Sequence, residues 1–209
     1  MLDKKNLSPK VLSQERVKHL MLVAEQAFME KGLEGCSIDY ICRQSGVSKS
    51  TIYRHYTNKV ALFEAVCRAV ATDQAEELSQ IALDLKAPLV SLQALSSHIH
   101  QLEARPRYRE FFRLFISEAG RHPELIERIR QEGVARVIER IAKFFAQLIK
   151  QGKMKHPNPT EAAITYYVLS RGHIRSLLRS ESGLNNQQEW RCQETEMMVF
   201  YKGCDVADA

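Results

Sequence analysis

Hydrophobic residues recur along this chain at helical spacing, and no segment of consequence shows the period-two alternation that is typical of a β-strand. The first segment with this spacing lies between residues 13 and 31, where five apolar side chains form one stripe: Val17, Leu20, Met21, Ala24 and Phe28. Ser13 can cap the start of this helix, and Gly32 can end it in a left-handed conformation. The pattern therefore predicts an amphipathic helix over residues 13–31.

Two much shorter helices are predicted next, over residues 38–44 and 49–55. Ser37 and Ser48 precede them and are favourable N-cap residues. Gly46 lies between them and can adopt the positive φ that a sharp turn requires. Val47 and Ile52 have the spacing of a hydrophobic staple, which fixes the angle at which the chain enters the second helix. This spacing is that of a helix-turn-helix.

The rest of the chain is also predicted to be helical, with breaks at its prolines. The expected helices cover residues 58–82, 88–104, 107–121, 123–151, 159–180 and 186–203. The fold class is therefore predicted to be all-α, with about nine helices and a long helix that joins a small N-terminal domain to a larger bundle. The expected boundaries are a flexible basic arm over 1–12, a helix-turn-helix domain over 13–63 and a second domain over 64–209.

The net charge of the 209-residue chain is +5, and the excess is concentrated towards the N-terminus. Residues 1–63 contain ten Lys or Arg and six Asp or Glu, whereas residues 64–209 contain twenty and nineteen. A basic first third favours a polyanionic partner such as nucleic acid. The arm adds Lys4, Lys5 and Lys10, which could follow phosphates or the minor groove.

Several function classes find no support in the sequence. The motifs GxGxxG, GxxxxGK[ST], HExxH and GxSxG are absent, so we expect no enzyme, no cofactor and no metal site. The five cysteines form no CxxC pair and are odd in number, which favours a reducing cytoplasm. No run of 18 apolar residues and no signal-peptide pattern is present, so we expect no membrane partner.

The second short helix carries mostly polar side chains, which are suited to contacts with base edges and phosphates. These are Lys49, Ser50, Thr51, Tyr53, Arg54 and His55. Lys59 lies in the first turn of the next helix, where the macrodipole disfavours a cation. A phosphate docked there would satisfy both the helix N–H groups and the ammonium group. The alternative interpretation is an ordinary solvated helix in an αα-corner.

Residues 15–63 resemble the DNA-binding domain of the TetR (tetracycline-repressor-like) transcriptional regulators. Three phrases carry the resemblance: LMLVAEQAFMEKG, SIDYICRQSGVSKSTIYRHY and NKVALFEAV. The resemblance implies a cytoplasmic homodimer that binds a palindromic double-stranded DNA operator, most often as a repressor released by a small-molecule effector. It implies phosphate contacts by Ser37, Ser48, Tyr53, His55 and Lys59, and base contacts by Lys49, Ser50, Thr51 and Arg54.

The chain departs from the family pattern at two positions. Cys42 stands where alanine is usual, and both residues are small. Ser50 stands where glycine is usual in many members, and a serine there could alter how closely the helix approaches the groove. Tyr53 and Tyr56 match the two aromatic positions of the family, and we expect Tyr56 to pack inside the small domain. These departures leave the base preference open.

A dimer surface and an effector pocket are expected in the second domain. Candidate interface residues lie in the last two helices: Ala163, Tyr166, Ser170, Ile174, Leu177, Trp190, Met197, Met198 and Tyr201. Four such helices from two subunits could bury a self-complementary patch, although the same residues could form an intramolecular core. Candidate pocket residues are aromatic or basic: His98, Arg105, Tyr108, Phe112, Phe115, Arg171 and His173.

Two alternatives to a ligand-released regulator stay open from the sequence. Cys36 lies just before the first of the two short helices and Cys42 lies within it, so a regulator of the same fold could sense redox state or metal through them. The second alternative, from another class, is a protein-interaction helical bundle that does not bind DNA.

Overall fold

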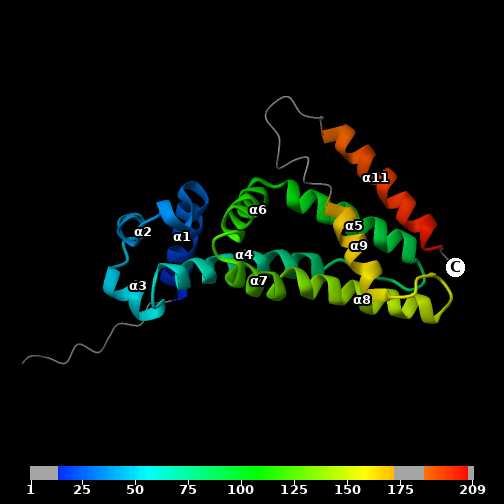
Figure 1. Cartoon of the computed structure of the whole chain (residues 1–209), viewed down its shortest axis with the longest axis horizontal. Helices are drawn as coiled ribbons and strands as arrows, with labels where there is room; N and C mark the ends of the chain where they lie inside the picture. Colours follow the sequence, from blue (N-terminus) through cyan, green and yellow to red (C-terminus); the bar gives the residue numbers. More distant parts are fainter. Residues whose placement is uncertain (1–13, 172–185, 207–209) are drawn as a thin grey trace, which may run out of the picture. The chain divides into compact units, whose positions relative to one another are not determined.

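The computed structural model describes residues 14–171 and 186–206, and these ranges contain helices but no strand (Figure 1). The helices are α1 Gln14–Gly35, α2 Ile38–Ser45, α3 Lys49–His55, α4 Lys59–Ser79, α5 Pro88–Ala104, α6 Pro106–Ala119, α7 Pro123–Glu132, α8 Val134–Lys150, α9 Pro159–Arg171 and α11 Asn186–Gly203. The predicted all-α class is confirmed. The described ranges hold ten helices rather than about nine because the expected helix over 123–151 is two helices.

The chain divides into two compact units, Met1–Cys67 and Arg68–Ala209. The sequence-based boundary, between residues 63 and 64, lies four residues before this division. The expected arm over 1–12 and the expected cap Ser13 lie outside the described residues. No helix in the described part of the chain is both long enough and apolar enough to span a lipid bilayer.

The first unit is built around the apolar stripe of α1. Leu20 and Phe28 are fully buried, and the Phe28 ring meets Phe63 of α4 edge-on, with 5.1 Å between ring centroids. Ile41 of α2 and Ile52 of α3 are also fully buried. The two short helices are therefore attached to a core that α1 and the start of α4 provide.

The ends of α2 and α3 follow the predicted local signals. The Ser37 hydroxyl accepts a hydrogen bond from the Tyr40 N–H at 3.1 Å, and the Ser48 hydroxyl accepts one from the Thr51 N–H at 3.3 Å. Gly46 ends α2 in the left-handed conformation, with φ 66° and ψ 12°. Gly32 also has positive φ, 68°, but its ψ of 176° is extended, and a further helical turn follows it.

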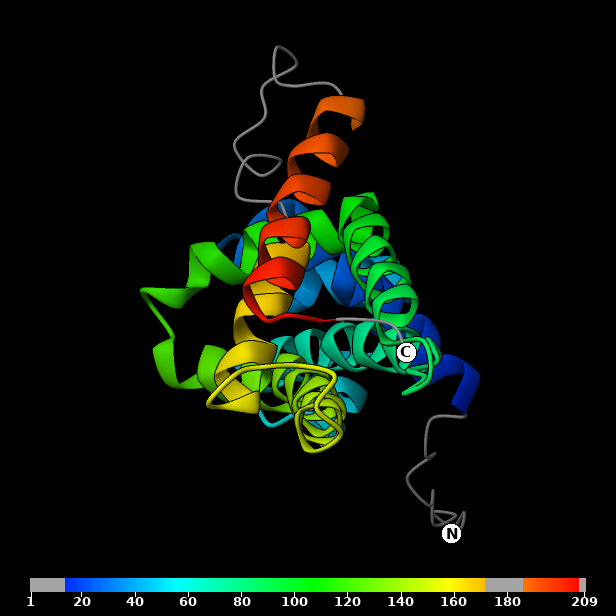
Figure 2. The ribbon, with the colours of Figure 1, turned by 90° about the vertical axis from the view of Figure 1, so that its right-hand side faces the viewer.

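The second unit has an aromatic core between α8, α9 and α11. The Phe145 ring meets Tyr166 edge-on at 5.7 Å and stacks with Phe200 at 5.9 Å. The Tyr166 hydroxyl donates a hydrogen bond to the Leu92 carbonyl of α5 at 2.5 Å. Figure 2 shows α11 passing beside α9. These contacts join α5, α8, α9 and α11 in one core.

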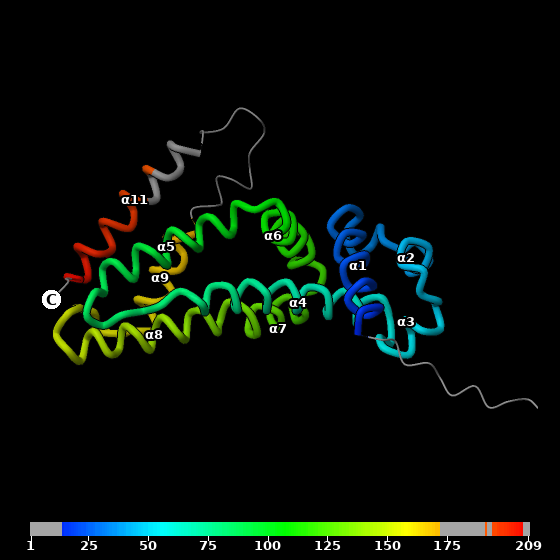
Figure 3. Tube along the Cα trace, turned by 180° about the vertical axis from the view of Figure 1, so that it is seen from behind, coloured from blue at the N-terminus to red at the C-terminus, as the bar shows by residue number. Residues whose placement is uncertain are grey.

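A glycine break separates α7 from α8. Gly133 has φ −96° and ψ −83°, and a Cβ atom built on it would lie 2.8 Å from the Cβ of Ala71 in α4. Further along, the Arg140 guanidinium donates hydrogen bonds to the carbonyls of Leu78 and Ile81. In Figure 3 the later part of α4 runs alongside α7 and α8. The helix predicted over 123–151 is therefore broken at Gly133, where α4 lies too close for a side chain.

We predict that Gly46→Ala destabilises the first unit by about 1–2 kcal/mol, because a side chain disfavours the left-handed conformation. An added Cβ at Gly46 meets no atom within 4 Å, so the loss would come from the backbone alone. Gly120→Ala is the matched control, since its φ is −74° and its Cβ also meets nothing within 4 Å. Urea unfolding followed by circular dichroism measures both variants, and equal stabilities would contradict the prediction.

Candidate nucleic-acid interface and ligand cavity

Helix α3 presents its polar residues outward because it has one buried anchor. Of its seven residues, only Ile52 is buried, at 0% exposure. Val47, which precedes the cap Ser48, is 6% exposed, so both ends of the predicted hydrophobic staple are buried. An isolated helix of this length is not stable in water. The anchor and the cap therefore hold α3 in place while the rest of its surface faces solvent.

Lys49 lies at the start of α3 and forms an ion pair with Asp39 of α2. The Nζ atom is 3.1 Å from Asp39 Oδ1, and the two side chains are 53% and 61% exposed. The hydrogen bond to Asp39 and its negative charge raise the pKa of the Lys49 ammonium group. Lys49 is thus a charged, solvent-accessible group that an acidic neighbour holds in the free protein.

The remaining polar residues of α3 are also accessible. Ser50, Arg54 and His55 are exposed, Tyr53 is 42% exposed, and Thr51 is half-buried. The Ser48 hydroxyl lies 3.1 Å from the Ser50 hydroxyl oxygen and 2.8 Å from that of Thr51. All six side chains proposed to face bases or phosphates on this helix therefore belong to one short, solvent-accessible element.

Ser37 and Ser48 serve first as helix caps. Each hydroxyl oxygen accepts a backbone N–H, as described above, and both residues are exposed. A hydroxyl group can accept one hydrogen bond and still donate its own proton. Capping is therefore compatible with the donation to a phosphate oxygen that the family resemblance implies.

The start of α4 differs in detail from the expected geometry. Asn58 is the cap residue, which the sequence reasoning missed, and its Oδ1 accepts the Ala61 N–H at 2.8 Å. The half-buried Lys59 directs its ammonium group to the Glu34 carbonyl at 3.3 Å. The Lys59 ammonium group is thus held beside the end of α1. Its positive charge belongs to the same unit as α3.

The two cysteines near α2 lack the lowered pKa of reactive thiols. Cys36 is 1% exposed, and burial raises its thiol pKa. Burial and the neighbouring Asp39 raise the pKa of the half-buried Cys42. Reactive cysteines have lowered pKa values and partial exposure, and no group of metal-ligating side chains occurs in the described ranges.

Tyr56 is half-buried, and its hydroxyl donates to the Met21 sulfur at 3.3 Å.

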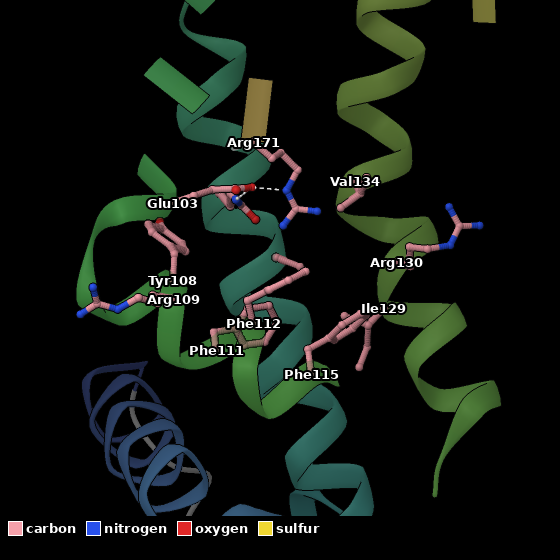
Figure 4. Close-up of a pocket in the computed structure, with 12 residues that line it drawn as sticks. Glu103, Tyr108, Arg109, Phe111, Phe112, Phe115, Ile129, Arg130, Val134 and Arg171 are labelled. Atoms are coloured by element: carbon pink, nitrogen blue, oxygen red, sulfur yellow. Dashed lines mark hydrogen bonds and ion pairs between the residues drawn. The ribbon is translucent and has the colours of Figure 1, made fainter. Parts of the chain in front are cut away.

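The second unit contains a cavity of about 260 Å³ between its helices (Figure 4). Among the described residues, α4 and α5 contribute Ala71, Gln74 and Glu103 to its lining, and α6 contributes Tyr108, Arg109, Phe111, Phe112 and Phe115. The other lining residues are Ile129, Arg130, Val134 and Arg171. Most of this surface is aromatic or aliphatic, as is usual for a small-molecule site.

Some of the predicted pocket residues line this cavity and others do not. Tyr108, Phe112, Phe115 and Arg171 line it. His98 and Arg105 instead bind Glu77, with Nε2 of His98 at 3.2 Å and the Arg105 guanidinium at 2.7 and 3.0 Å from its carboxylate oxygens. His173 lies outside the described residues.

Sequence reasoning missed the acidic residue of the cavity. Glu103 is 7% exposed, and its Oε1 accepts hydrogen bonds from Arg171 Nε at 2.5 Å and from Gln74 Nε2 at 3.5 Å. One signal could have identified it: Glu103 continues the spacing of Leu92, Ser96 and Ile99 on the buried face of α5. A carboxylate on such a face requires a partner.

The candidate dimer residues divide by burial within the single chain. Ala163, Tyr166, Ser170, Met197 and Tyr201 are at most 4% exposed, so they form the core of their own bundle and offer a partner almost no surface. Met198 is 47% exposed. Ile174, Leu177 and the Trp190 side chain lie outside the described residues. The exposed apolar side chains on α9 and α11 that the sequence reasoning missed are Ile164, Val168 and Val199.

Comparison with known proteins adds relatives for both units. The family model described as bacterial regulatory proteins, tetR family, matches residues 20–66, and that of the AefR-like transcriptional repressor C-terminal domain matches residues 90–197. The HTH-type transcriptional activator FasR of Mycolicibacterium smegmatis is 35% identical over 52 residues, 25% of this chain. The match spans only 24% of FasR, about a quarter of its length.

Solved structures resemble the chain over nearly its whole length. The flavonoid-responsive regulator FrrA is 25% identical, with a TM-score of 0.71, over 92% of this chain and 98% of FrrA. A protein from Mesorhizobium loti classed as a TetR-family transcriptional regulator is 21% identical, with a TM-score of 0.75, over 93% and 98% of the two chains. The helix-turn-helix geometry, the matched fold and a family model that covers more than half of the sequence agree, so this chain belongs to the TetR family of bacterial transcriptional regulators.

Proposed function

We propose that this regulator is a homodimeric repressor that binds a palindromic operator through α3 and leaves it when a small molecule enters the cavity of the second unit. The observation that carries the proposal is the exposed polar surface of α3, anchored by the buried Ile52. In this proposal the protein acts in the cytoplasm and catalyses no reaction.

Helix α3 is the DNA-reading element of the proposal. Lys49, Ser50, Thr51 and Arg54 contact base edges, since the major groove offers acceptors to such donors. The residues that contact phosphates are Ser37, Ser48, Tyr53, His55 and Lys59. Phosphate contacts fix the register of the protein, whereas base contacts select the sequence.

Release by a ligand is supported by the aromatic cavity and by a relative. A cavity of about 260 Å³ lined by Phe111, Phe112 and Phe115 suits a small apolar molecule. FrrA, which resembles this chain along most of its length, is named as a flavonoid-responsive regulator. A ligand that binds one conformation better than the other shifts the equilibrium between them. We infer that the favoured conformation is the one that does not bind DNA.

The homodimer is proposed to form through α9 and α11. Ile164 and Val168 are four residues apart on α9 and are 44% and 61% exposed. Met198 and Val199 on α11 are 47% and 68% exposed. A twofold axis would bring the same surface of two chains together. Two subunits would then place their α3 helices in half-sites about 34–36 Å apart.

We propose repression rather than activation because of the family model that matches the C-terminal part of the chain. The model that matches residues 90–197 is described as that of a repressor, whereas the activator FasR aligns over only 52 residues. The decisive experiment selects bound DNA from a random pool, tests release by candidate ligands and measures transcription from the selected site. Transcription that rises when the protein binds would contradict repression, and no enrichment of any sequence would contradict specific DNA recognition.

We predict that Asp39→Asn raises operator affinity about two- to fivefold, because an exposed ion pair that restrains Lys49 contributes up to about 1 kcal/mol. Titrations of fluorescent operator DNA measure the change, and its dependence on salt should become steeper. Glu139→Gln is the matched control, since it removes the exposed pair with Lys143 on α8. A fall in affinity for Asp39→Asn would contradict the prediction and show that Asp39 positions Lys49 for DNA.

We predict different effects for substitutions of Lys49 and Lys59, two lysines of the first unit. Lys49→Ala should change which base is preferred at one position of each half-site, because it removes about 1–3 kcal/mol of discrimination against the wrong base. Lys59→Ala should weaken all sequences alike and lower the salt slope by about one. Lys143→Ala on α8 is the control. Binding measured on a panel of single-base operator variants distinguishes these outcomes, and parent-like binding by both variants would contradict the assigned roles.

We predict that Val168→Glu dissociates the dimer, because two buried carboxylates would meet across a twofold axis. Light scattering coupled to size exclusion should report half the parent mass, and operator affinity should fall. Val90→Glu on α5 is the control, since Val90 is 59% exposed and Val168 is 61% exposed. Loss of the dimer in Val90→Glu alone would place the interface on α5 instead.

A further inference from the structure

The cavity of the second unit has aromatic walls and one polar end. Figure 4 shows Phe111, Phe115 and Ile129 together on one side and Glu103 and Arg171 joined to each other on the other, where the Arg171 guanidinium also lies over the Phe112 ring. Its volume of about 260 Å³ is slightly below the ~300–1,000 Å³ of sites for drug-sized molecules. The space therefore suits a molecule of about two rings, with one end at the charged pair.

The charged pair at the polar end is fixed on both sides. Arg171 Nε lies 2.5 Å from Glu103 Oε1, and the two side chains are 16% and 7% exposed. The Arg171 guanidinium lies 4.5 Å from the centre of the Phe112 ring and 5.3 Å from that of Tyr167. Gln74 adds a hydrogen bond to the same carboxylate oxygen. These contacts hold an acceptor group and a donor group side by side.

The charges at this end compensate each other. Glu103 and Arg171 carry opposite unit charges in contact, so a ligand entering beside them meets no net charge from the pair. The two other arginines of the lining, Arg109 and Arg130, point away from the centre in Figure 4. Arg130 is engaged by Glu127, at 2.7 and 2.6 Å. The end of the cavity is therefore polar but locally neutral.

We propose that the cavity selects uncharged aromatic molecules that carry a hydroxyl group at one end. The hydroxyl proton is donated to Glu103, and the hydroxyl oxygen accepts from the Arg171 guanidinium. A guanidinium has five N–H donors and a carboxylate accepts about four hydrogen bonds, so the existing pair leaves capacity for both. This inference rests on the proposed ligand-binding role of the cavity and names its ligand class.

Charged ligands of the same shape are disfavoured by this arrangement. A ligand carboxylate would face Glu103, and a ligand ammonium group would face Arg171. Either ligand would bring a buried charge beside a like charge, or break the pair and leave one partner uncompensated. The selectivity thus comes from the pair as a whole.

The test uses the full chain and three probes with one biphenyl body: 4-hydroxybiphenyl, biphenyl-4-carboxylate and protonated 4-(aminomethyl)biphenyl. Isothermal calorimetry without DNA measures each dissociation constant. We expect the hydroxyl probe to bind at least about tenfold more tightly than either charged probe. Equal or tighter binding of a charged probe to the parent chain, or no binding of any probe, would overturn the inference.

Two variants should change the preference in opposite directions. Glu103→Gln leaves the Arg171 charge uncompensated and should shift preference towards the carboxylate. Arg171→Gln leaves Glu103 uncompensated and should shift it towards the ammonium probe. A general loss of folding weakens all three probes and cannot produce opposite shifts. Glu139→Gln is the control, since it removes the exposed pair with Lys143 on α8 and neither residue lines the cavity, and the order of the three probes should stay as in the parent.

The selectivity and the proposed release of DNA can fail separately. Calorimetry reports the preference without DNA, and a second titration adds 4-hydroxybiphenyl to the protein–operator complex. Selective binding with unchanged operator affinity would support the inference and contradict ligand release. If Glu103→Gln and Arg171→Gln both kept the probe preference of the parent chain, the inference would be overturned even if the ligand released DNA.

Discussion

The burial of Ile52 is the contact on which the proposed DNA-reading surface depends. Helix α3 has seven residues, and Ile52 alone is buried, at 0% exposure. Full burial of such a side chain contributes about 1.5–3 kcal/mol, which is needed because a helix this short is unstable alone. Val47 and the Ser48 cap add to this anchor. The remaining side chains of α3 are at least partly exposed and are therefore available to a partner.

The second unit solves the opposite problem, since it must bury a charged pair inside an apolar bundle. Desolvation makes such a pair a weak source of stability, and its loss on one side is costly. The pair of Glu103 and Arg171 is satisfied by its own contact, by Gln74 and by the faces of Phe112 and Tyr167. A cavity built in this way would select a ligand by hydrogen-bonding geometry and charge as well as by apolar area.

The two units also differ in how their residues combine roles. In the first unit, Ser37 and Ser48 cap helices and remain exposed, so the groups that end the local structure are also available to a partner. In the second unit, Tyr166 and Ser170 looked suited to a partner but are buried in the bundle. Helical spacing alone does not distinguish a core face from an interface face, because both are apolar stripes.

The sequence by itself determined the features that depend on residues a few positions apart. The two caps, the positive φ of Gly46 and the staple of Val47 with Ile52 all follow from local chemistry, and the family resemblance followed from the same segment. Tertiary structure alone decided the rest. Glu103 meets Arg171 across 68 positions, and Ala71 of α4 lies too close to Gly133 for a side chain there, because packing between distant segments sets these contacts and no local pattern records them.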